Sequence, residues 1–270
     1  MAPQTILITG AGRGIGKRLA IGFARNGLRV GLLARSNAEL DLADLEIEHN
    51  GGRSLRLRAD LRDFREVSLA VERMRQEFGS VDAAICASGA FGAIGPLAGV
   101  DPKCWTEAVE TGLLGAMHLV RAVLPQMLER RAGKIVLLVG PGAETPRPNF
   151  SAYAAANAAL VRFAETLAEE VRDANVQINC MNPGATYTSM IDEILAAGER
   201  AGPRELSHAH EIRSNGGTSP ERQIALAQFL VSPRSNHLSG KLICVNDDWR
   251  RLEQSNDTPE LFTLRRVSRA

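Results

Sequence analysis

The chain has 270 residues, of which 44% are hydrophobic, and it carries 32 basic against 31 acidic residues for a net charge of +1. This size is ordinary for one α/β domain with a large buried core, so we expect a single domain over residues 1–270. The balanced charge excludes a general electrostatic attraction to nucleic acid or to an anionic membrane, and a small molecule is therefore the expected partner.

The first predicted elements are a strand at 5–8, the glycine-rich segment Thr-Gly-Ala-Gly-Arg-Gly-Ile-Gly at 9–16, and an amphipathic helix at 15–25. Glycines at such a junction let the backbone come close to an anion, and the helix N-terminus presents free N–H groups and a positive dipole end to it. A strand before the glycines and a helix after them are the context that a dinucleotide-binding motif requires. We therefore favour a pyrophosphate site over an ordinary tight turn.

Strand and helix patterns then alternate along the chain, as in βαβ crossovers. The apolar strand runs are rich in Val, Ile and Leu, which is typical of a parallel sheet covered on both faces. We therefore expect an α/β, doubly wound (Rossmann-type) fold with a parallel sheet of about seven strands, helices on both faces and a core at 4–246. The further predicted strands lie at 28–34, 54–59, 81–86, 134–139, 177–181 and 241–245, and the helices at 37–49, 63–78, 101–130, 151–173, within 189–201, and at 220–231.

Segment 202–217 fits no regular element, because it combines several glycines, a proline and two histidines. We interpret it as a mobile excursion and, as a hypothesis, as a lid over the C-terminal edge of the sheet. His208 and His210 are two residues apart, but no third ligand is near them in sequence, so a solvated loop is favoured over a metal site.

The tail at 247–270 carries Trp249 and leucines between charged residues, including Arg265, Arg266 and Arg269. We expect it to pack on the body of the domain or on a second subunit. A nucleic-acid role for its arginines has little support in a chain of balanced charge.

The four cysteines, Cys86, Cys104, Cys180 and Cys244, have wide and irregular spacings, and three of them lie in apolar strand runs. This favours reduced core thiols over disulfides or a metal site. No apolar run reaches the ~20 residues of a membrane span, and no charged leader precedes the first strand. We therefore expect a cytoplasmic protein without metal and without a membrane partner.

Over about residues 4–246 these motifs, in this order, resemble the short-chain dehydrogenase/reductase family. TGAGRGIG is similar to the family's TGxxxGxG motif, and Asp60 follows the third strand like the family's adenine-contacting acid. Pro183-Gly184 with Thr188 resembles the nicotinamide-side segment, and Tyr153 opens its helix where the family has its catalytic tyrosine. The resemblance implies an oxidoreductase that uses a nicotinamide cofactor and forms a dimer or tetramer.

Charge at the end of the second strand predicts which cofactor is used. Members of the family that prefer NAD have an acid there, because a carboxylate binds the ribose hydroxyls and repels a 2′-phosphate. This chain has Ala34, followed by Arg35, while Arg13 lies in the glycine loop. Both guanidinium groups can converge on a 2′-phosphate, so we expect NADP(H), with two solvated surface arginines as the alternative. The candidate cofactor-binding residues are Gly10, Arg13, Gly14, Ile15, Gly16, Arg35, Asp60, Leu61, Ala87, Gly89, Tyr153, Asn157, Pro183, Gly184, Thr186 and Thr188.

The proton-handling residues depart from the family pattern. The family pairs its tyrosine with a lysine four residues later, a serine thirteen residues earlier and an asparagine in the long fourth helix; here Tyr153 is retained, but Asn157, Gly140 and Gly112 stand at those positions. A neutral Asn157 cannot lower the pKa of the tyrosine as a lysine cation does. We therefore expect Asn157 to reach the ribose, Tyr153 to keep a nearly unperturbed hydroxyl, and Gly140 to leave a gap where a hydroxyl donor would stand.

Two functions stay open. The first is an NADP(H)-dependent oxidoreductase acting on a carbonyl or alcohol substrate with impaired or rewired proton transfer, and the retained Tyr153 favours it. The second is a catalytically inactive nucleotide-binding sensor or partner subunit, favoured by the simultaneous loss at Gly140 and Asn157. The helices at 101–130 and 151–173 have alanine and leucine on more than one face, which predicts a homodimer or homotetramer.

Overall fold

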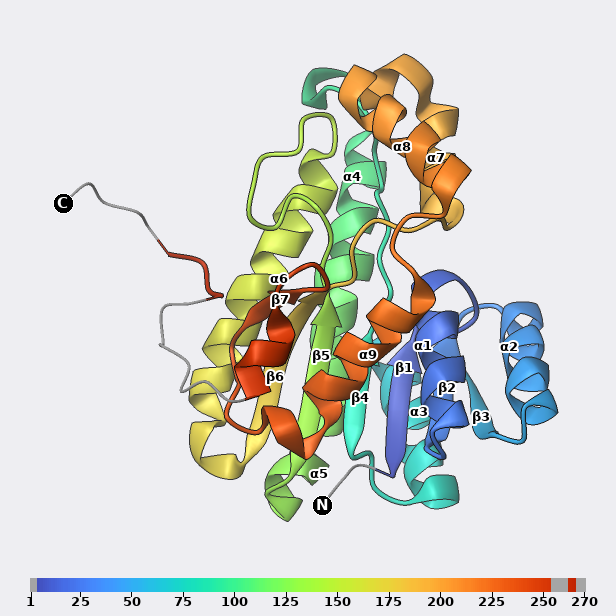
Figure 1. Cartoon of the computed structure of the whole chain (residues 1–270), viewed down its shortest axis with the longest axis vertical. Helices are drawn as coiled ribbons and strands as arrows, with labels where there is room; N and C mark the ends of the chain where they lie inside the picture. Colours follow the sequence, from blue (N-terminus) through green and yellow to red (C-terminus); the bar gives the residue numbers. More distant parts are fainter. Residues whose placement is uncertain (1–3, 254–261, 266–270) are drawn as a thin grey trace.

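A seven-stranded parallel sheet forms the centre of the protein, whose computed structural model describes residues 4–253 and 262–265 (Figure 1). The strand order is β3-β2-β1-β4-β5-β6-β7, and every neighbouring pair is parallel. The order reverses between β1 and β4, and in such sheets ligands bind beyond the carboxyl ends of the strands at this switch point. The strands are β1 (Thr5–Thr9), β2 (Arg29–Ala34), β3 (Arg53–Arg58), β4 (Ala83–Cys86), β5 (Gly133–Leu138), β6 (Val176–Asn182) and β7 (Leu242–Cys244).

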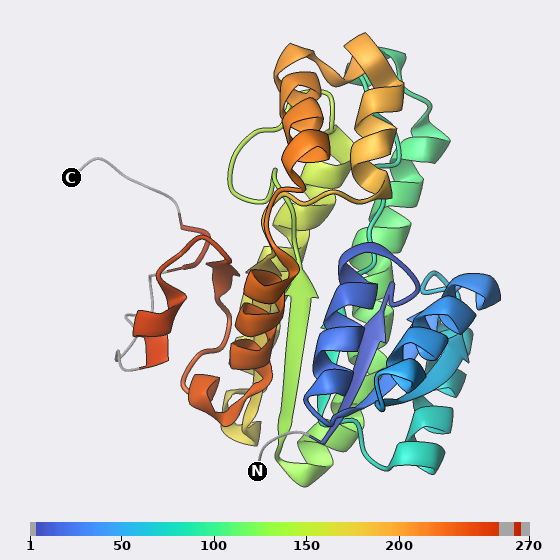
Figure 2. The ribbon, with the colours of Figure 1, turned by 45° about the vertical axis from the view of Figure 1, so that its right-hand side comes forward.

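Helices cover both faces of the sheet, so the predicted doubly wound fold is confirmed (Figures 1 and 2). One hydrophobic cluster joins one face to α3 (Phe64–Phe78), α5 (Gly115–Arg130) and α6 (Ser151–Glu170). A second cluster joins the other face to α1 (Gly14–Arg25), α2 (Asn37–His49) and α9 (Pro220–Val231). Short 3₁₀ turns lie at η1 (Leu97–Gly99), η3 (Arg172–Ala174), η4 (Gly198–Ala201), η5 (Pro233–Ser235) and η6 (Trp249–Glu253).

The expected single helix at 101–130 is interrupted. It consists of α4 (Pro102–Val109), a π-helical turn η2 (Glu110–Leu114) and α5. A π turn adds one residue to a helical turn without changing the polar and apolar composition, so the sequence pattern did not reveal it. The turn contains Gly112, which the resemblance places where the family has its asparagine.

The prediction of an irregular segment at 202–217 is wrong, because most of it is helix α8 (Pro203–Asn215). Pro203 occupies the first helical position, where its missing N–H is not needed. Gly202 and Gly216 adopt φ values of 89° and 80° at the two ends, so these residues mark helix boundaries rather than a loop. With α7 (Ser189–Ala197), α8 lies beyond the C-terminal ends of the strands, the location expected of a lid (Figure 1).

The described part of the tail packs on the domain body, which is one of the two expected arrangements. Trp249 is buried and stacks on Phe229 of α9, with ring centroids 5.2 Å apart. Farther along, the Leu264 N–H donates to Oε1 of Glu165 on α6 at 2.7 Å. Arg266 and Arg269 lie outside the described residues.

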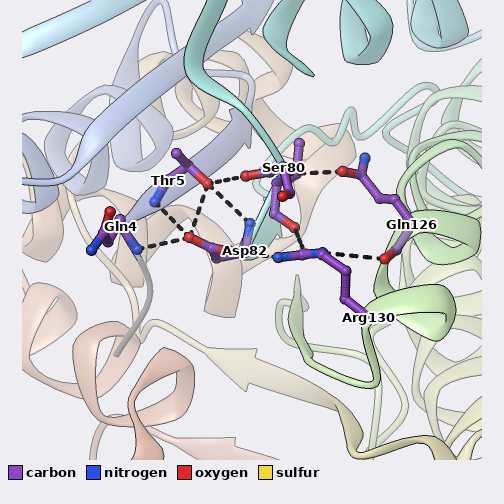
Figure 3. Close-up of polar contacts among 7 residues, drawn as sticks. Gln4, Thr5, Ser80, Asp82, Gln126 and Arg130 are labelled. Carbon is purple, nitrogen blue, oxygen red and sulfur yellow. Dashed lines mark hydrogen bonds and ion pairs between the residues drawn. The ribbon is translucent and has the colours of Figure 1, made fainter. Parts of the chain in front are cut away.

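At the N-terminal ends of the strands, Asp82 connects the starts of β1 and β4 to the end of α5 (Figure 3). One carboxylate oxygen accepts hydrogen bonds from the backbone N–H groups of Gln4 (2.8 Å) and Thr5 (3.1 Å), and the other accepts from Nη1 of Arg130 at 2.8 Å. Burial raises the pKa of Asp82, but these donors outweigh it and lower the pKa overall. This network fixes the strand ends far from the switch point.

The four cysteines are free thiols, as expected, with Cys86 and Cys180 buried in the sheet and Cys104 and Cys244 partly buried. Within the two described ranges, no helix is both long enough and apolar enough to cross a membrane. The cytoplasmic location stays a prediction.

Candidate functional site

The glycine loop leaves the N-terminus of α1 open to an anion. Gly10 and Gly14 adopt φ values of 62° and 57°, the region that glycine enters without strain. Arg13, the residue before α1, makes no side-chain cap, and the first turn has no acidic residue. The first N–H groups of the helix are therefore free to bind a phosphate oxygen, so the loop fits the pyrophosphate of a dinucleotide.

Gly16 has a different role from the other glycines of the motif. A Cβ atom on Gly16 would lie 2.3 Å from the carbonyl oxygen of Gly10, so only glycine allows α1 to pack this closely against the loop. Gly16 lines neither of the two cavities described below. It shapes the phosphate site without facing it.

The first cavity, here called the dinucleotide groove, has a volume of about 450 Å³ and runs from the glycine loop past the ends of β2 and β3. It brings together most of the residues predicted to bind the adenosine half of the cofactor. Sequence reasoning missed Ser36, Glu39, Thr111 and Glu193, which also line it. The predicted residues in its wall are Gly10, Arg13, Gly14, Ile15, Arg35, Asp60, Leu61, Ala87, Gly89 and Thr188.

Charged side chains of both signs surround the groove. Arg13 and Arg35 both line it, and Nη1 of Arg13 lies 3.7 Å from Oε1 of Glu39. Nη2 of Arg62 lies 2.6 Å from Oδ2 of Asp60 and forms an ion pair with it. The hydrogen bond from Arg62 lowers the pKa of Asp60 despite the opposing effect of burial, so the carboxylate is ionised and already has a cationic partner.

The second cavity, here called the Tyr153 pocket, has a volume of about 590 Å³. Apolar side chains such as Phe91, Leu160, Ile191 and Ile194 form much of its wall, and α7 and α8 contribute its outer side. It contains the remaining predicted residues, Tyr153, Asn157, Pro183, Gly184 and Thr186. The groove and the pocket adjoin each other, because both are lined by Ile15, Ala87, Ser88, Gly89, Ala90, Thr188 and Met190.

The expected gap at Gly140 is absent, because Tyr153 fills it. A Cβ atom on Gly140 would lie 2.1 Å from the Tyr153 hydroxyl oxygen and 2.9 Å from Cζ of the same ring. The ring also packs edge-to-face on Phe91, with centroids 4.9 Å apart. The tyrosine therefore lies against the end of β5, in space that a serine side chain would occupy.

Asn157 uses its amide within the protein. Its Oδ1 accepts a hydrogen bond from the Gly140 N–H at 2.7 Å, and its Nδ2 donates to the backbone carbonyl of Tyr153 at 2.7 Å. The side chain is buried. Asn157 thus holds the tyrosine's helix against the end of β5, and its contact with a ribose stays a prediction.

The expectation of an unperturbed Tyr153 hydroxyl is wrong. Burial raises the pKa of Tyr153, while the Arg147 cation and the Asn157 amide lower it only in part. The phenol is therefore protonated throughout the neutral range and can act as a proton donor.

Arg147 is the main pocket residue that the sequence did not reveal. Only 8% of its side chain is exposed, and Nε (3.1 Å) and Nη2 (2.6 Å) donate to the same Glu205 oxygen, Oε2, on α8. Its guanidinium carbon lies 4.1 Å from the Phe150 ring centroid and 5.6 Å from that of Tyr153. The residue lies in an irregular segment, where periodicity gives no signal about burial.

The segment after β6 is held by side chains from α1 and α9. Nη1 of Arg18 donates to Oγ1 of Thr186 at 2.6 Å, and Nε2 of the buried Gln223 donates to the Pro183 carbonyl at 3.0 Å. The Thr186 hydroxyl thus has a protein partner. Thr188 lies over the glycine loop, with Cγ2 3.5 Å from where a Cβ on Gly14 would be.

The two histidines at 208 and 210 lie on α8. His208 lines the Tyr153 pocket, and its Nδ1 is 3.7 Å from Oε2 of Glu211. Within 4–253 and 262–265, no group of three or more His, Cys, Asp or Glu side chains is placed to hold a metal ion.

The chain is similar in sequence and in structure to known dehydrogenases and oxidoreductases. Residues 4–198 match the family model described as short chain dehydrogenase. The oxidoreductase UcpA of Salmonella typhimurium is 31% identical over 242 residues, covering 88% of this chain and 90% of that protein. A cyclohexanol dehydrogenase of Rhodococcus sp. (strain TK6) is 29% identical over 262 residues, covering 90% and 94%. A solved short-chain type dehydrogenase/reductase from Mycobacterium ulcerans superposes with a TM-score of 0.79 at 26% identity, covering 91% and 90%.

Proposed function

Because this chain belongs to the short-chain dehydrogenase/reductase family, we propose that it is an NADP(H)-dependent oxidoreductase that interconverts a carbonyl group and an alcohol, with proton transfer rewired around Tyr153. The observation that carries the proposal is that the two cavities adjoin and share seven lining residues. A dinucleotide whose pyrophosphate lies on the glycine loop would reach from Arg13 and Arg35 into the pocket that contains Tyr153.

The pocket residues have separate tasks in this reaction. A bound nicotinamide supplies the hydride for carbonyl reduction. Tyr153 holds the proton that the carbonyl oxygen receives, and the raised pKa of its phenol keeps that proton in place at neutral pH. Phe91, Leu160 and Ile194 provide apolar walls that exclude water from the reacting group. The protonated tyrosine favours reduction over oxidation.

An assay of NADPH oxidation across a broad carbonyl panel, with a calorimetric titration of NADPH in parallel, tests this proposal. Cyclic ketones belong in the panel, because one relative is a cyclohexanol dehydrogenase. Turnover of any member that depends on Tyr153 supports the enzyme, whereas tight NADPH binding without turnover supports the second function.

That second function, a nucleotide-binding sensor or partner subunit, is favoured by the environment of Asn157. Its amide is bonded to Gly140 and to the backbone of Tyr153, at the position where the family has a lysine. The chain thus combines an open dinucleotide groove with a proton-handling group in which Tyr153 alone is retained.

The cofactor preference is testable by calorimetry. NADPH is expected to bind at least about tenfold more tightly than NADH, because Arg13 and Arg35 line the groove and no acid follows β2 directly. Arg35→Ala is expected to weaken NADPH binding by ~1.5–3 kcal/mol, the value of a charge-assisted hydrogen bond, while NADH binding changes little. Arg73→Ala, an exposed arginine on α3, is the control. Equal affinities for both cofactors would contradict the assignment.

We also propose a homodimer or homotetramer, with a second copy covering the outer face of α5. Leu114 and Leu128 lie near the same helix face and are 42% and 39% exposed, and Phe64 of the neighbouring α3 is 40% exposed. Light scattering is expected to give a dimer or tetramer that Leu114→Glu with Leu128→Glu dissociates. Leu45→Glu, on an exposed site of α2, should leave the assembly unchanged. A stable monomer of the unmodified protein at micromolar concentration would exclude this proposal.

A further inference from the structure

Three aromatic rings surround the guanidinium group of Arg147. Its central carbon lies 4.1 Å from the ring centroid of Phe150, 5.2 Å from that of Phe91 and 5.6 Å from that of Tyr153. Aromatic faces attract a cation, and the attraction is larger where water is excluded. Both Nε and Nη2 are bound by Glu205, so the group is held in one orientation.

The position of this cation matters because no lysine lines the Tyr153 pocket. The chain has four lysines, Lys17, Lys103, Lys134 and Lys241. None of them lines the Tyr153 pocket, where the basic side chains are Arg147, Arg204 and His208. Of these three, Arg147 is the one placed over the Tyr153 ring in the described structure, with its guanidinium carbon 5.6 Å from the ring centroid.

We propose that Arg147 is a positioning residue that supplies the positive charge beside Tyr153 in place of a lysine, and that Glu205 on α8 sets how much of that charge Tyr153 senses. The proposal rests on the proposed function, in which Tyr153 gives up a proton. As the proton leaves, negative charge develops on the phenol oxygen, and a nearby cation held in a water-poor pocket stabilises it. Because Glu205 belongs to α8, the same ion pair connects the lid-like helix to the tyrosine.

The other charged groups of the pocket are accounted for. Arg204, Glu205, His208 and Glu211 line it from α8, while the contributions from α7 and from the Phe91 segment are apolar or polar but uncharged. Burial raises the pKa of Tyr153, and the Arg147 charge is the largest influence that lowers it.

A titration of Tyr153 without any turnover tests the inference. The chain has two tyrosines, Tyr153 and the partly exposed Tyr187, so Tyr187→Phe leaves one. Uniform replacement of tyrosine by a fluorotyrosine makes the phenol more acidic, and ¹⁹F NMR then follows its ionisation below the alkaline range in which proteins unfold. Circular dichroism at each pH confirms that the fold persists.

The two partners of the ion pair should act in opposite directions. Arg147→Met is expected to raise the pKa of Tyr153 by about one unit, whereas Glu205→Gln, which leaves the Arg147 charge uncompensated, is expected to lower it. Arg147→Lys should restore most of the effect of the arginine. Arg234→Met, which breaks an exposed ion pair with Glu253, is the control.

If both substitutions shift the titration in the same direction, or neither shifts it, Arg147 has only a structural role and the inference is wrong. If Arg147→Met does not fold, the sign of the shift in Glu205→Gln decides. The proposed function is judged separately, by turnover in the carbonyl panel and its dependence on Tyr153, whatever the titration gives.

Discussion

Replacing Tyr153 by phenylalanine is expected to lower the rate of NADPH-dependent carbonyl reduction by about 10²–10³-fold, the usual cost of losing a proton donor in the transition state. The family resemblance predicts Tyr153 as the one retained proton-handling residue, and Tyr153 lies in the pocket that adjoins the dinucleotide groove. NADPH affinity should change by less than about twofold, since phenylalanine keeps the ring contact with Phe91. Steady-state kinetics together with calorimetry separates the two effects.

The pH dependence follows from the direction of the tyrosine shift. Burial raises the pKa of Tyr153 above its ordinary value near 10, so the phenol is protonated across the neutral range. Carbonyl reduction, which needs the acid form, should therefore be nearly independent of pH between about 6 and 9. Alcohol oxidation needs the ionised form, and its rate should rise about tenfold per pH unit towards the folded pKa.

A contrary result would assign the chemistry to other residues. If the unmodified protein reduces a carbonyl at an ordinary ~10 s⁻¹ and Tyr153→Phe keeps that rate, Tyr153 is not the donor. An inflection near pH 7 in the reduction rate would also contradict a tyrosine that is protonated across the neutral range.

The sequence was sufficient for the fold and for the dinucleotide groove because their signals are local. A strand, glycines and a helix N-terminus are adjacent in the chain, and apolar periodicity marks each crossover. The prediction for segment 202–217 was wrong because its glycines and proline were interpreted as loop residues, whereas Gly202, Pro203 and Gly216 mark the ends of α8. Proline is favoured at the first position of a helix and glycine just past its end, so these residue types also occur at helix boundaries.

For the Tyr153 pocket, the sequence could indicate which family residues are replaced, but not how the remaining side chains are arranged. The resemblance to the family predicts that Gly140 and Asn157 stand where a serine and a lysine are usual. That the Tyr153 hydroxyl occupies the space of a side chain at Gly140 depends on a contact between α6 and the segment that follows β5. The pair of Arg147 with Glu205 likewise joins segments 58 residues apart, and no pattern in either segment encodes it.

The tyrosine's position also changes what a restored site would do. The sequence alone suggests that Gly140→Ser with Asn157→Lys rebuilds the family's proton-handling group. In the structure, a serine Cβ would lie 2.1 Å from the Tyr153 hydroxyl, so the ring must move before both side chains fit. Lysine at 157 would also remove the acceptor of the Gly140 N–H. Gly140, Tyr153 and Asn157 therefore form one packed arrangement, so residues 140 and 157 cannot be exchanged independently of the tyrosine.

Lys134 is expected to limit the stability of the fold at neutral pH. It lies on β5 with 7% of its surface exposed, and its Nζ donates to Oγ of the buried Ser235 at 3.2 Å. Burial lowers the pKa of Lys134 to about 8 from 10.5. None of the salt bridges in the described structure involves Lys134. Below about pH 8 the folded protein must therefore hold a buried ammonium group without a carboxylate partner.

The sign of the effect follows from proton counting. Between pH 8 and 10.5 the unfolded chain binds the lysine proton more strongly than the folded protein does, so the contribution of Lys134 to the free energy of unfolding rises with pH across that window. Below pH 8 the full cost of about 3 kcal/mol is present, at 1.36 kcal/mol per pKa unit. The thiols of Cys86 and Cys180, which are buried, and of Cys244, which is partly buried, have raised pKa values and act in the opposite direction at alkaline pH.

Lys134→Met should therefore raise the free energy of unfolding at pH 7 by about 3 kcal/mol, because it replaces a buried charge by an apolar chain of similar length. Denaturant titrations of the variant and the unmodified protein from pH 7 to 10.5 should show this gain shrinking towards zero, and taking the difference removes the contribution of the thiols. Lys103→Met, an exposed lysine on α4, should change stability by less than about 0.5 kcal/mol. A gain in the Lys134 variant that stays constant across this pH range would come from packing alone and would show that Lys134 is not titrating in the fold.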